Sequence, residues 1–115
     1  MNGYSNMNHY FLEDVACKYG LNEAIVLDML FRETEWARAI DVDPLDGHYW
    51  TLHSTDSFTK LFPYLSERQI QRALEKLEKH GLILIRSYGM TPVDSAAWYT
   101  VTNEVYGLYG QTSSE

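Results

Sequence analysis

Residues 66–81 read Ser-Glu-Arg-Gln-Ile-Gln-Arg-Ala-Leu-Glu-Lys-Leu-Glu-Lys-His-Gly, a segment whose start, inner face and end are all marked. Ser66 is a favourable N-cap residue, and Gln69 stands three residues later in the capping-box position. Gly81 follows the last turn, where glycine commonly ends a helix. One face is apolar at helical spacing and consists of Ile70, Ala73, Leu74 and Leu77. The segment therefore predicts a capped amphipathic helix packed on a core.

The rest of the chain predicts a short succession of helices and strands around this segment. The expected helices cover 10–19, 22–40, 54–62 and 66–80, and the expected strands cover 48–52, 82–88 and 96–102. Asn22 and Ser54 are the expected caps of the second and third helices. The order helix-helix-strand-helix-helix-strand-strand is that of a winged helix-turn-helix, an α+β and mainly α fold. We expect one domain over residues 1–102, with 103–115 forming either a short helix or a loose tail.

Composition restricts the class of protein. Of the 115 residues, 45% are apolar and 22% are charged, which is typical of a soluble globular domain. The single cysteine, Cys17, excludes an internal disulfide framework and favours a reducing compartment. The sequence has no apolar run long enough to span a bilayer, and its first residues lack the features of a signal peptide. These observations predict a cytoplasmic protein without membrane association.

Charge is unevenly distributed along the chain, whose formal net charge is −7. Residues 1–58 hold three basic and ten acidic residues, which gives −7, whereas residues 59–115 hold six of each. Within 66–86, five basic residues face three acidic ones, which gives +2. A protein that coats nucleic acid non-specifically needs a broad basic surface, so that class is disfavoured. The only locally basic stretch coincides with the capped helix and the strand after it.

The polar face of residues 66–80 carries side chains that suit a DNA groove. Arginine pairs with guanine through two hydrogen bonds, and glutamine pairs with adenine. A serine-capped helix N-terminus can hold a phosphate, and lysines farther along can contact the DNA backbone. The expected DNA-binding residues are Ser66, Arg68, Gln69, Gln71, Arg72, Lys76, Lys79 and Arg86. The alternative is that these residues form the solvated face of an ordinary surface helix.

Three stretches carry a resemblance to a known family. They are Gly47-His-Tyr-Trp-Thr-Leu-His-Ser-Thr-Asp-Ser-Phe, Phe62-Pro-Tyr-Leu-Ser-Glu-Arg-Gln-Ile-Gln-Arg-Ala-Leu-Glu-Lys-Leu-Glu-Lys-His-Gly-Leu-Ile and Trp98-Tyr-Thr-Val. Through them, and through Gly20-Leu-Asn-Glu-Ala-Ile-Val-Leu, which is similar to the family's second helix, residues 10–102 resemble the N-terminal winged-helix domains of DnaD-type replication-organiser proteins from phages and mobile elements. The resemblance implies self-association through this domain and assembly of protein on double-stranded DNA. We therefore expect a DNA-binding module in replication initiation or transcriptional regulation of a bacterial or phage element, with a replication or regulatory protein as a further partner.

The sequence departs from this family in two respects. Members often carry a C-terminal domain for single-stranded DNA and helicase-loading partners, and residues 103–115 are too few to form one. The chain is thus either a domain of a longer protein or a naturally short one. The turn between the last two strands, residues 89–95, has no lysine or arginine, so we do not expect it to contact a minor groove.

The second helix is apolar on more than one face, which a single small core would not cover. One interpretation is a homodimer interface, with Met29, Leu30 and Trp36 as its residues. The other is that this helix runs through the centre of the core. A dimer would present two recognition helices to successive major grooves.

A second function class is a protein-interaction module on the same fold. In this reading the acidic first half, including Glu33 and Glu35, binds a basic partner, and the winged helix is only a scaffold. An enzyme is not expected, because the sequence offers no nucleophile or acid–base set and no phosphate loop.

No cofactor or metal is expected either. The aspartates at 41, 43 and 46 do not match a calcium loop, because the third is one position late and Leu52 occupies the place of the bidentate glutamate. The four histidines have no zinc spacing; they are His9, His48, His53 and His80.

Overall fold

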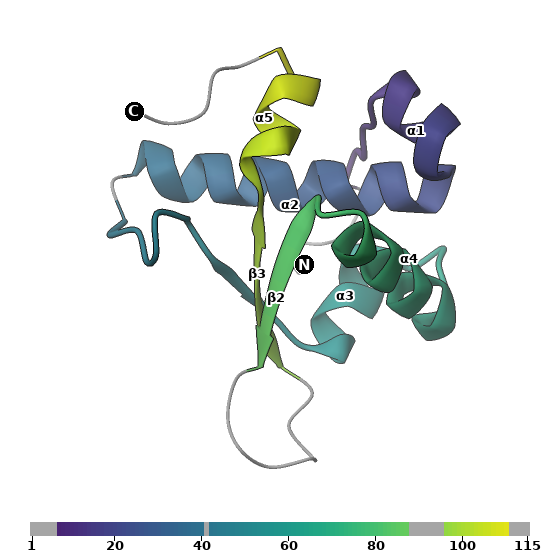
Figure 1. The fold of residues 1–115 in the computed structure, drawn as a ribbon. Helices are drawn as coiled ribbons and strands as arrows, with labels where there is room; N and C mark the ends of the chain where they lie inside the picture. The colour runs from purple at the N-terminus through teal and green to yellow at the C-terminus, as the bar shows by residue number, and fades with distance from the viewer. Residues whose placement is uncertain (1–6, 41, 88–95, 111–115) are drawn as a thin grey trace.

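The structure is a computed structural model in which residues 7–40, 42–87 and 96–110 are described. It is a mainly helical α+β protein with one small sheet (Figure 1). Its elements are α1 (Glu13–Tyr19), α2 (Leu21–Ala39), β1 (Thr51–His53), α3 (Thr55–Leu61), α4 (Glu67–Lys79), β2 (Ile83–Ser87), β3 (Ala97–Val101) and α5 (Asn103–Leu108). The first seven confirm the predicted order of helices and strands. For the C-terminal residues, the short-helix alternative holds over 103–108.

The helix starts follow local capping chemistry, with one prediction wrong. The backbone N–H of Ser57 donates to Oγ of Ser54 at 3.1 Å, so the predicted cap of α3 is confirmed. Asn22 does not cap α2, because this helix begins one residue earlier, at Leu21, with Gly20 as its N-cap residue. Gly20 has φ +117°, a backbone conformation that favours glycine, and it joins α1 directly to α2.

The first strand lies later in the chain than its aromatic pattern predicted. Leu45 and His48 exchange backbone hydrogen bonds of 2.8 and 3.0 Å around Asp46 (φ +54°) and Gly47 (φ +76°). Positive φ at both central residues is typical of a two-residue hairpin turn. Residues 48–50 therefore leave this turn and precede the strand, and β1 covers only Thr51–His53.

The sheet is antiparallel, with strand order β1-β3-β2. Alternation along each strand gives it two different faces. Ile83, Tyr99 and Val101 are buried on the inner face, toward the helices. On the outer face, Trp98 lies between Leu52 of β1 and Arg86 of β2, which are its cross-strand partners. Helices α3 and α4 lie on one side of the sheet and the segment 42–50 lies on the other (Figure 1).

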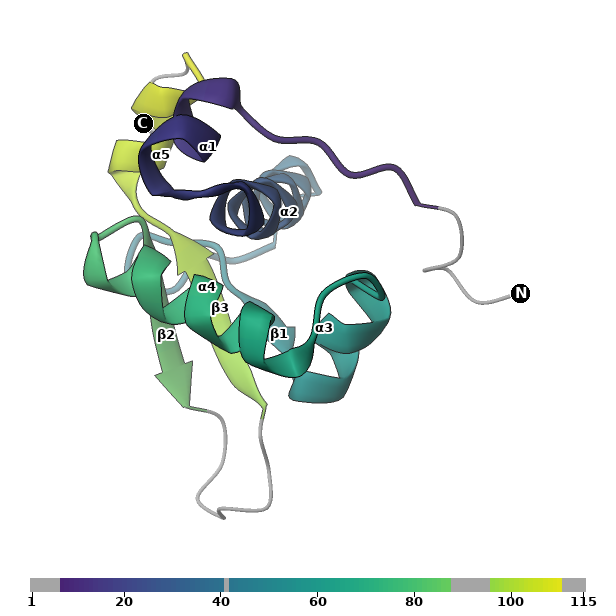
Figure 2. The same ribbon diagram turned by 90° about the vertical axis from the view of Figure 1, so that its right-hand side faces the viewer.

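Helix α2 runs through the middle of the molecule and contacts α1, α4, β1 and β3. Figure 2 shows α5 on the same side of the sheet as α1 and α2. The ring of Phe31 in α2 meets Tyr106 of α5 edge-on at 5.7 Å between centroids and stacks on Tyr109, the C-cap residue of α5, at 4.0 Å. Buried side chains from α1, α2, α3, α4, β2, β3 and α5 form one cluster, which includes Val15, Leu27, Phe58, Leu77, Ile83, Val101 and Val105. The central position of α2 explains why its sequence is apolar on more than one face.

Thr102 connects the end of β3 to the residues that follow α4 by two hydrogen bonds. Its backbone N–H donates to the carbonyl of Leu82 at 3.0 Å, and its hydroxyl donates to the carbonyl of Gly81 at 2.7 Å. Gly81 directly follows the C-cap of α4 with φ +75°, as predicted for a glycine that ends a helix. The base of the β2–β3 hairpin is therefore fastened to the C-terminus of α4.

Candidate nucleic-acid interface

Helix α4 begins with the capping box that the sequence predicts. The backbone N–H of Gln69 donates to Oγ of Ser66 at 3.1 Å, and the backbone N–H of Ser66 donates to Oε1 of Gln69 at 2.8 Å. Two N–H groups of the helix start are thus satisfied by side chains. The prediction that Ser66 caps this helix is confirmed.

The turn between α3 and α4 is short and is stabilised by a hydrogen bond within it and by a contact with the segment before α1. The backbone N–H of Leu65 donates to the carbonyl of Phe62 at 3.0 Å, which closes the turn. The hydroxyl of Tyr64 and Nδ1 of His9 are 2.7 Å apart, so the segment before α1 touches the turn. Burial lowers the pKa of His9, which favours its neutral ring in this contact. Helices α3 and α4 therefore have a fixed relative position.

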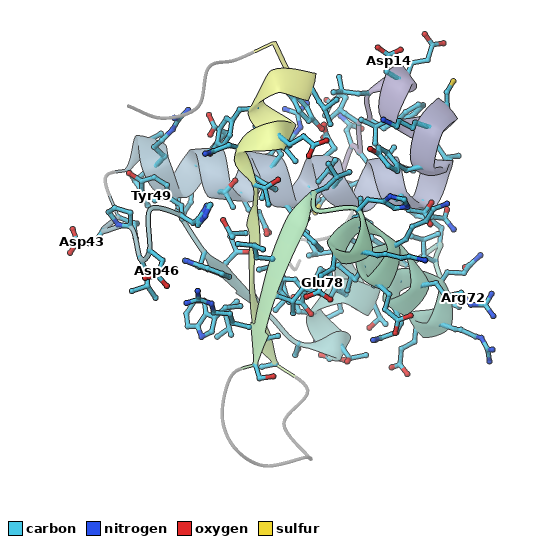
Figure 3. The ribbon with its side chains drawn as sticks, viewed as in Figure 1. Asp14, Asp43, Asp46, Tyr49, Arg72 and Glu78 are labelled. Carbon is cyan, nitrogen blue, oxygen red and sulfur yellow. The ribbon has the colours of Figure 1, made fainter. Side chains whose placement is uncertain are left out.

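The two faces of α4 separate as expected. Ile70, Ala73, Leu74 and Leu77 are buried. The opposite face is exposed and contains Ser66, Arg68, Gln69, Gln71, Arg72, Lys76 and Lys79. Figure 3 shows Arg72 extending from α4 away from the body of the protein. Beside it, an open groove of about 420 Å³ is lined by Thr55, Glu67, Arg68, Gln71, Arg72 and Glu75.

The basic side chains of α4 differ from most others by having no carboxylate partner among the residues that the structure describes. Across the described residues, Arg32, Arg38, Lys60 and Arg86 each form an ion pair. Within the same ranges no ion pair involves the cations of α4, which are Arg68, Arg72, Lys76 and Lys79. Glu75 is instead 3.4 Å from Nε2 of Gln71, which donates to it. The charges of these four side chains are therefore available to an anion.

Four of the predicted DNA-binding residues already use their side chains within the protein: Ser66 and Gln69 in the cap, Gln71 with Glu75, and Arg86 with Asp46. Gln69 uses its side-chain oxygen in the cap, so pairing with adenine would require that bond to break. Arg86 lies on the outer face of the sheet, where its Nη1 is 2.6 Å from Oδ2 of Asp46 and its guanidinium lies over the ring of Trp50. Asp46 and Arg72 lie on opposite sides of the molecule (Figure 3). Arg86 is thus not part of the surface formed by α4.

The turn predicted over residues 89–95 lies outside the described residues.

The dimer prediction was wrong for Leu30. This side chain is 0% exposed, because α2 is the central helix and Leu30 belongs to its core-facing side. Met29 is half-buried and packs against the same core. Trp36 alone of the three is well exposed, at 66%. The residues proposed for the interface therefore do not form one accessible surface.

The carboxylates chosen for the acidic-face alternative are also engaged within the protein. Oε1 of Glu35 accepts a 2.6 Å bond from Arg38. Oε1 of Glu33 is 2.6 Å from Nε2 of His53, whose Nδ1 is 2.8 Å from Oγ of Ser57. Neutralising Glu33 would therefore disturb the fold and could not serve as a clean test of an acidic interface.

This serine–histidine–glutamate chain was not anticipated from the sequence, because Glu33 and His53 are 20 residues apart. The same three residue types occur in hydrolases, where the serine must reach a substrate. Here His53 is buried and stacks on Phe58 at 4.6 Å, and the neighbouring pocket on α3 is lined by Thr55, Phe58 and Thr59, not by Ser57. The arrangement links α2, β1 and α3 through one buried ring.

A second buried polar group lies between α2 and α5. Asp28 is 3% exposed and accepts bonds of 2.6 Å from Nε of Arg32 and from the hydroxyl of Tyr109. Burial and this bond to Asp28 raise the pKa of Tyr109. The hydrogen bond to Asp28 also raises the pKa of Arg32. Tyr109 and Arg32 therefore retain the protons that they donate in hydrogen bonds to the buried Asp28.

No other site of known chemistry is found in the described ranges. They contain no group of three histidine, cysteine or acidic residues placed to hold a metal ion, and none of their helices is long and apolar enough to cross a bilayer. Comparison with family models, with curated proteins and with solved structures finds no match to this chain.

Proposed function

We propose that this protein is a winged helix-turn-helix module that binds double-stranded DNA through α4. The observation that carries the proposal is the set of exposed cations on α4, namely Arg68, Arg72, Lys76 and Lys79, which form no ion pair with any described residue. The three arginines outside α4, namely Arg32, Arg38 and Arg86, each form an ion pair, so the lack of one distinguishes the arginines of α4. Their availability to phosphates is the simplest physical reason for the arrangement.

The element order supports the winged helix-turn-helix assignment. Helix α3, a short closed turn and the capped α4 follow one another, and an antiparallel pair of strands comes next. In helix-turn-helix proteins the second helix enters the major groove while the first braces it across the DNA backbone. The cap and the contact between Tyr64 and His9 would hold α4 in place for that role.

The residues of α4 divide into two roles along the helix. Arg68, Gln71 and Arg72 lie in its first turns, where a recognition helix contacts base edges, and they can pair with guanine and adenine. Lys76 and Lys79 lie farther along and would meet phosphates. Ser66 and the free N–H groups at the helix start can hold one phosphate. Gln69 takes a secondary role because its side chain is bonded within the cap, and Arg86 because it lies on the sheet away from α4, whereas Gln71 would give up only its exposed 3.4 Å bond to Glu75.

The chemistry implies modest affinity. On duplexes of random sequence, Arg68 and Arg72 would contact phosphates as Lys76 and Lys79 do, and four such contacts would give a salt slope of roughly −3.6, at roughly −0.9 per contact. The remaining surface of a chain with net charge −7 opposes binding. A monomer would therefore bind weakly at physiological salt. We infer that the protein acts in the cytoplasm, in replication initiation or transcriptional regulation of a bacterial or phage element. In that role a second copy or a partner protein would be needed to strengthen binding.

The experiment is fluorescence anisotropy of a pool of labelled random duplexes. Wild type and the Arg68→Ala, Arg72→Ala double variant are compared at low and at physiological salt. Binding by wild type that weakens with salt and is lost in the double variant would support the proposal. Equal binding by both proteins, or none at low salt, would overturn it.

A further inference from the structure

The outer face of the sheet carries a second surface, separate from α4. Exposed apolar side chains gather there from the strands and from the segment before them: Val42, Leu45, Leu52, Leu84 and Trp98. Isolated exposed apolar residues are ordinary, but a contiguous group with a polar rim marks a site of protein contact. In Figure 1 no helix covers this side of the strands, and the segment 42–50 lies along it.

The segment 42–50 is held in one conformation by contacts that use its polar atoms. Nε1 of Trp50 donates to the carbonyl of Leu45 at 3.0 Å, and the Thr100 hydroxyl donates to the carbonyl of Tyr49 at 2.6 Å. Arg86 joins it to β2 through Asp46 and the ring of Trp50. The apolar side chains of this surface are therefore displayed on an ordered scaffold.

Between the segment and the sheet lies a pocket of about 260 Å³ with two indole walls. Its lining residues are Val42, Asp43, Leu45, Trp50, Arg86 and Trp98. Pockets for small molecules occupy about 300–1,000 Å³, so this one is below that range and suits a single large side chain. Tryptophan and arginine are the residues that most often dominate protein interfaces.

The charge around the pocket is negative. Arg86 is neutralised by Asp46 at 2.6 Å, whereas Asp43 forms no ion pair with any residue of the described ranges. Figure 3 shows Asp43 at the far edge of the molecule, extending outward. A basic side chain next to an apolar one would complement this rim, and an acidic one would be repelled.

We propose that the outer face of the sheet is a docking site for a segment of a partner protein that carries a large apolar side chain beside a lysine or arginine. The apolar side chain would enter the pocket between Trp50 and Trp98, and the cation would pair with Asp43. This surface is distinct from α4, so one molecule could hold duplex DNA and the partner segment at once.

The chain offers an internal readout, because it contains three tryptophans and Trp36 lies on α2 outside the pocket. The ¹⁵N-labelled full chain is titrated with short synthetic peptides that have a central leucine, methionine or tryptophan flanked by lysines. Matched peptides replace the lysines with glutamates or the central residue with serine. The three indole N–H signals are assigned with single Trp→Phe variants.

The lysine-flanked apolar peptides should shift the Trp50 and Trp98 signals and leave Trp36 unchanged. Trp98→Ala should weaken their binding about tenfold or more, and Asp43→Asn by up to about fivefold. Leu45→Ala, which removes a pocket wall without touching the sheet, should also weaken binding, whereas Trp36→Ala should not. Arg72→Ala should leave peptide binding unchanged, which separates this proposal from the one for α4.

Three results would overturn the proposal. The first is that no peptide shifts the signals of Trp50 and Trp98. The second is that glutamate-flanked peptides bind as well as lysine-flanked ones. The third is that duplex DNA, and not the peptides, shifts these two indoles.

Discussion

The hydroxyl of Tyr109 donates a 2.6 Å hydrogen bond to Asp28, 81 residues earlier in the chain. It joins the end of α5 to the centre of α2 and gives a buried carboxylate its second partner beside Arg32. The ring of Tyr109 also stacks on Phe31 at 4.0 Å. The C-terminal helix is thus held to the core by both a polar and an apolar contact.

Tyr109→Phe should lower the free energy of unfolding by about 1–3 kcal/mol, because Asp28 would lose a hydrogen bond while remaining buried. Urea unfolding of the variant and wild type measures this difference. Tyr10→Phe, in which an exposed tyrosine loses its hydroxyl, is the matched control and should change stability by less than about 0.5 kcal/mol. Equal stability of all three proteins would show that the contact contributes nothing.

Stability should fall at alkaline pH. Burial raises the pKa of Tyr109 above its usual value near 10 and also raises those of Tyr64, Tyr99 and Tyr106. Because the folded protein holds these protons more tightly than the unfolded chain, the stabilisation is complete below about pH 10 and is lost as the pH rises further. Urea midpoints measured from neutral to alkaline pH should show this loss, and the loss should be smaller in Tyr109→Phe. A flat profile would contradict the burial of these hydroxyls.

Ser66→Ala should cost about 1 kcal/mol of stability, because it removes one side of the capping box at the start of α4. Ser87→Ala, at an exposed position at the end of β2, provides a control that removes the same hydroxyl and should change little. Thermal or urea unfolding measures both. If the two variants lose the same amount, the cap does not determine the stability of this helix.

The salt dependence of duplex binding should report directly on α4. On duplexes of random sequence, where Arg72 would contact a phosphate and not a guanine, Arg72→Ala should reduce the magnitude of the slope of log K against log salt by about 0.9. Lys18→Ala removes the same charge from exposed α1 and should leave the slope unchanged. Anisotropy titrations at several salt concentrations give both slopes. Equal slopes for the two variants would mean that net charge, and not the position of Arg72, governs binding.

The parts of the fold that depend on neighbouring residues were predictable. Ser66, Gln69 and Gly81 mark the ends of α4 through bonds within one or two turns, and the spacing of Ile70 and Leu77 fixes its buried face. The order of helices and strands followed from such local patterns. The exposed cations of α4 were predictable for the same reason, since they are the complement of its apolar stripe.

What the sequence did not reveal depends on contacts between distant residues. An apolar helix can be a core helix or an interface, and only the elements packed around α2 decide that Leu30 is buried. Arg86 was assigned to DNA because its partner Asp46 is 40 residues away in the chain, too far for a local pattern to indicate the ion pair. The bond between His53 and Glu33 was missed for the same reason, across 20 residues.

The bonds of Thr102 to Gly81 and Leu82 bear on the thermodynamics of recognition. These bonds connect three parts of the protein in the absence of a ligand: α4, the base of the β2–β3 hairpin and the start of α5. Parts connected in this way have little conformational entropy left to lose on binding, so a larger share of each contact would appear as affinity. If α4 binds a duplex as we propose, this preorganisation would offset the small number of its cations and the net negative charge of the chain.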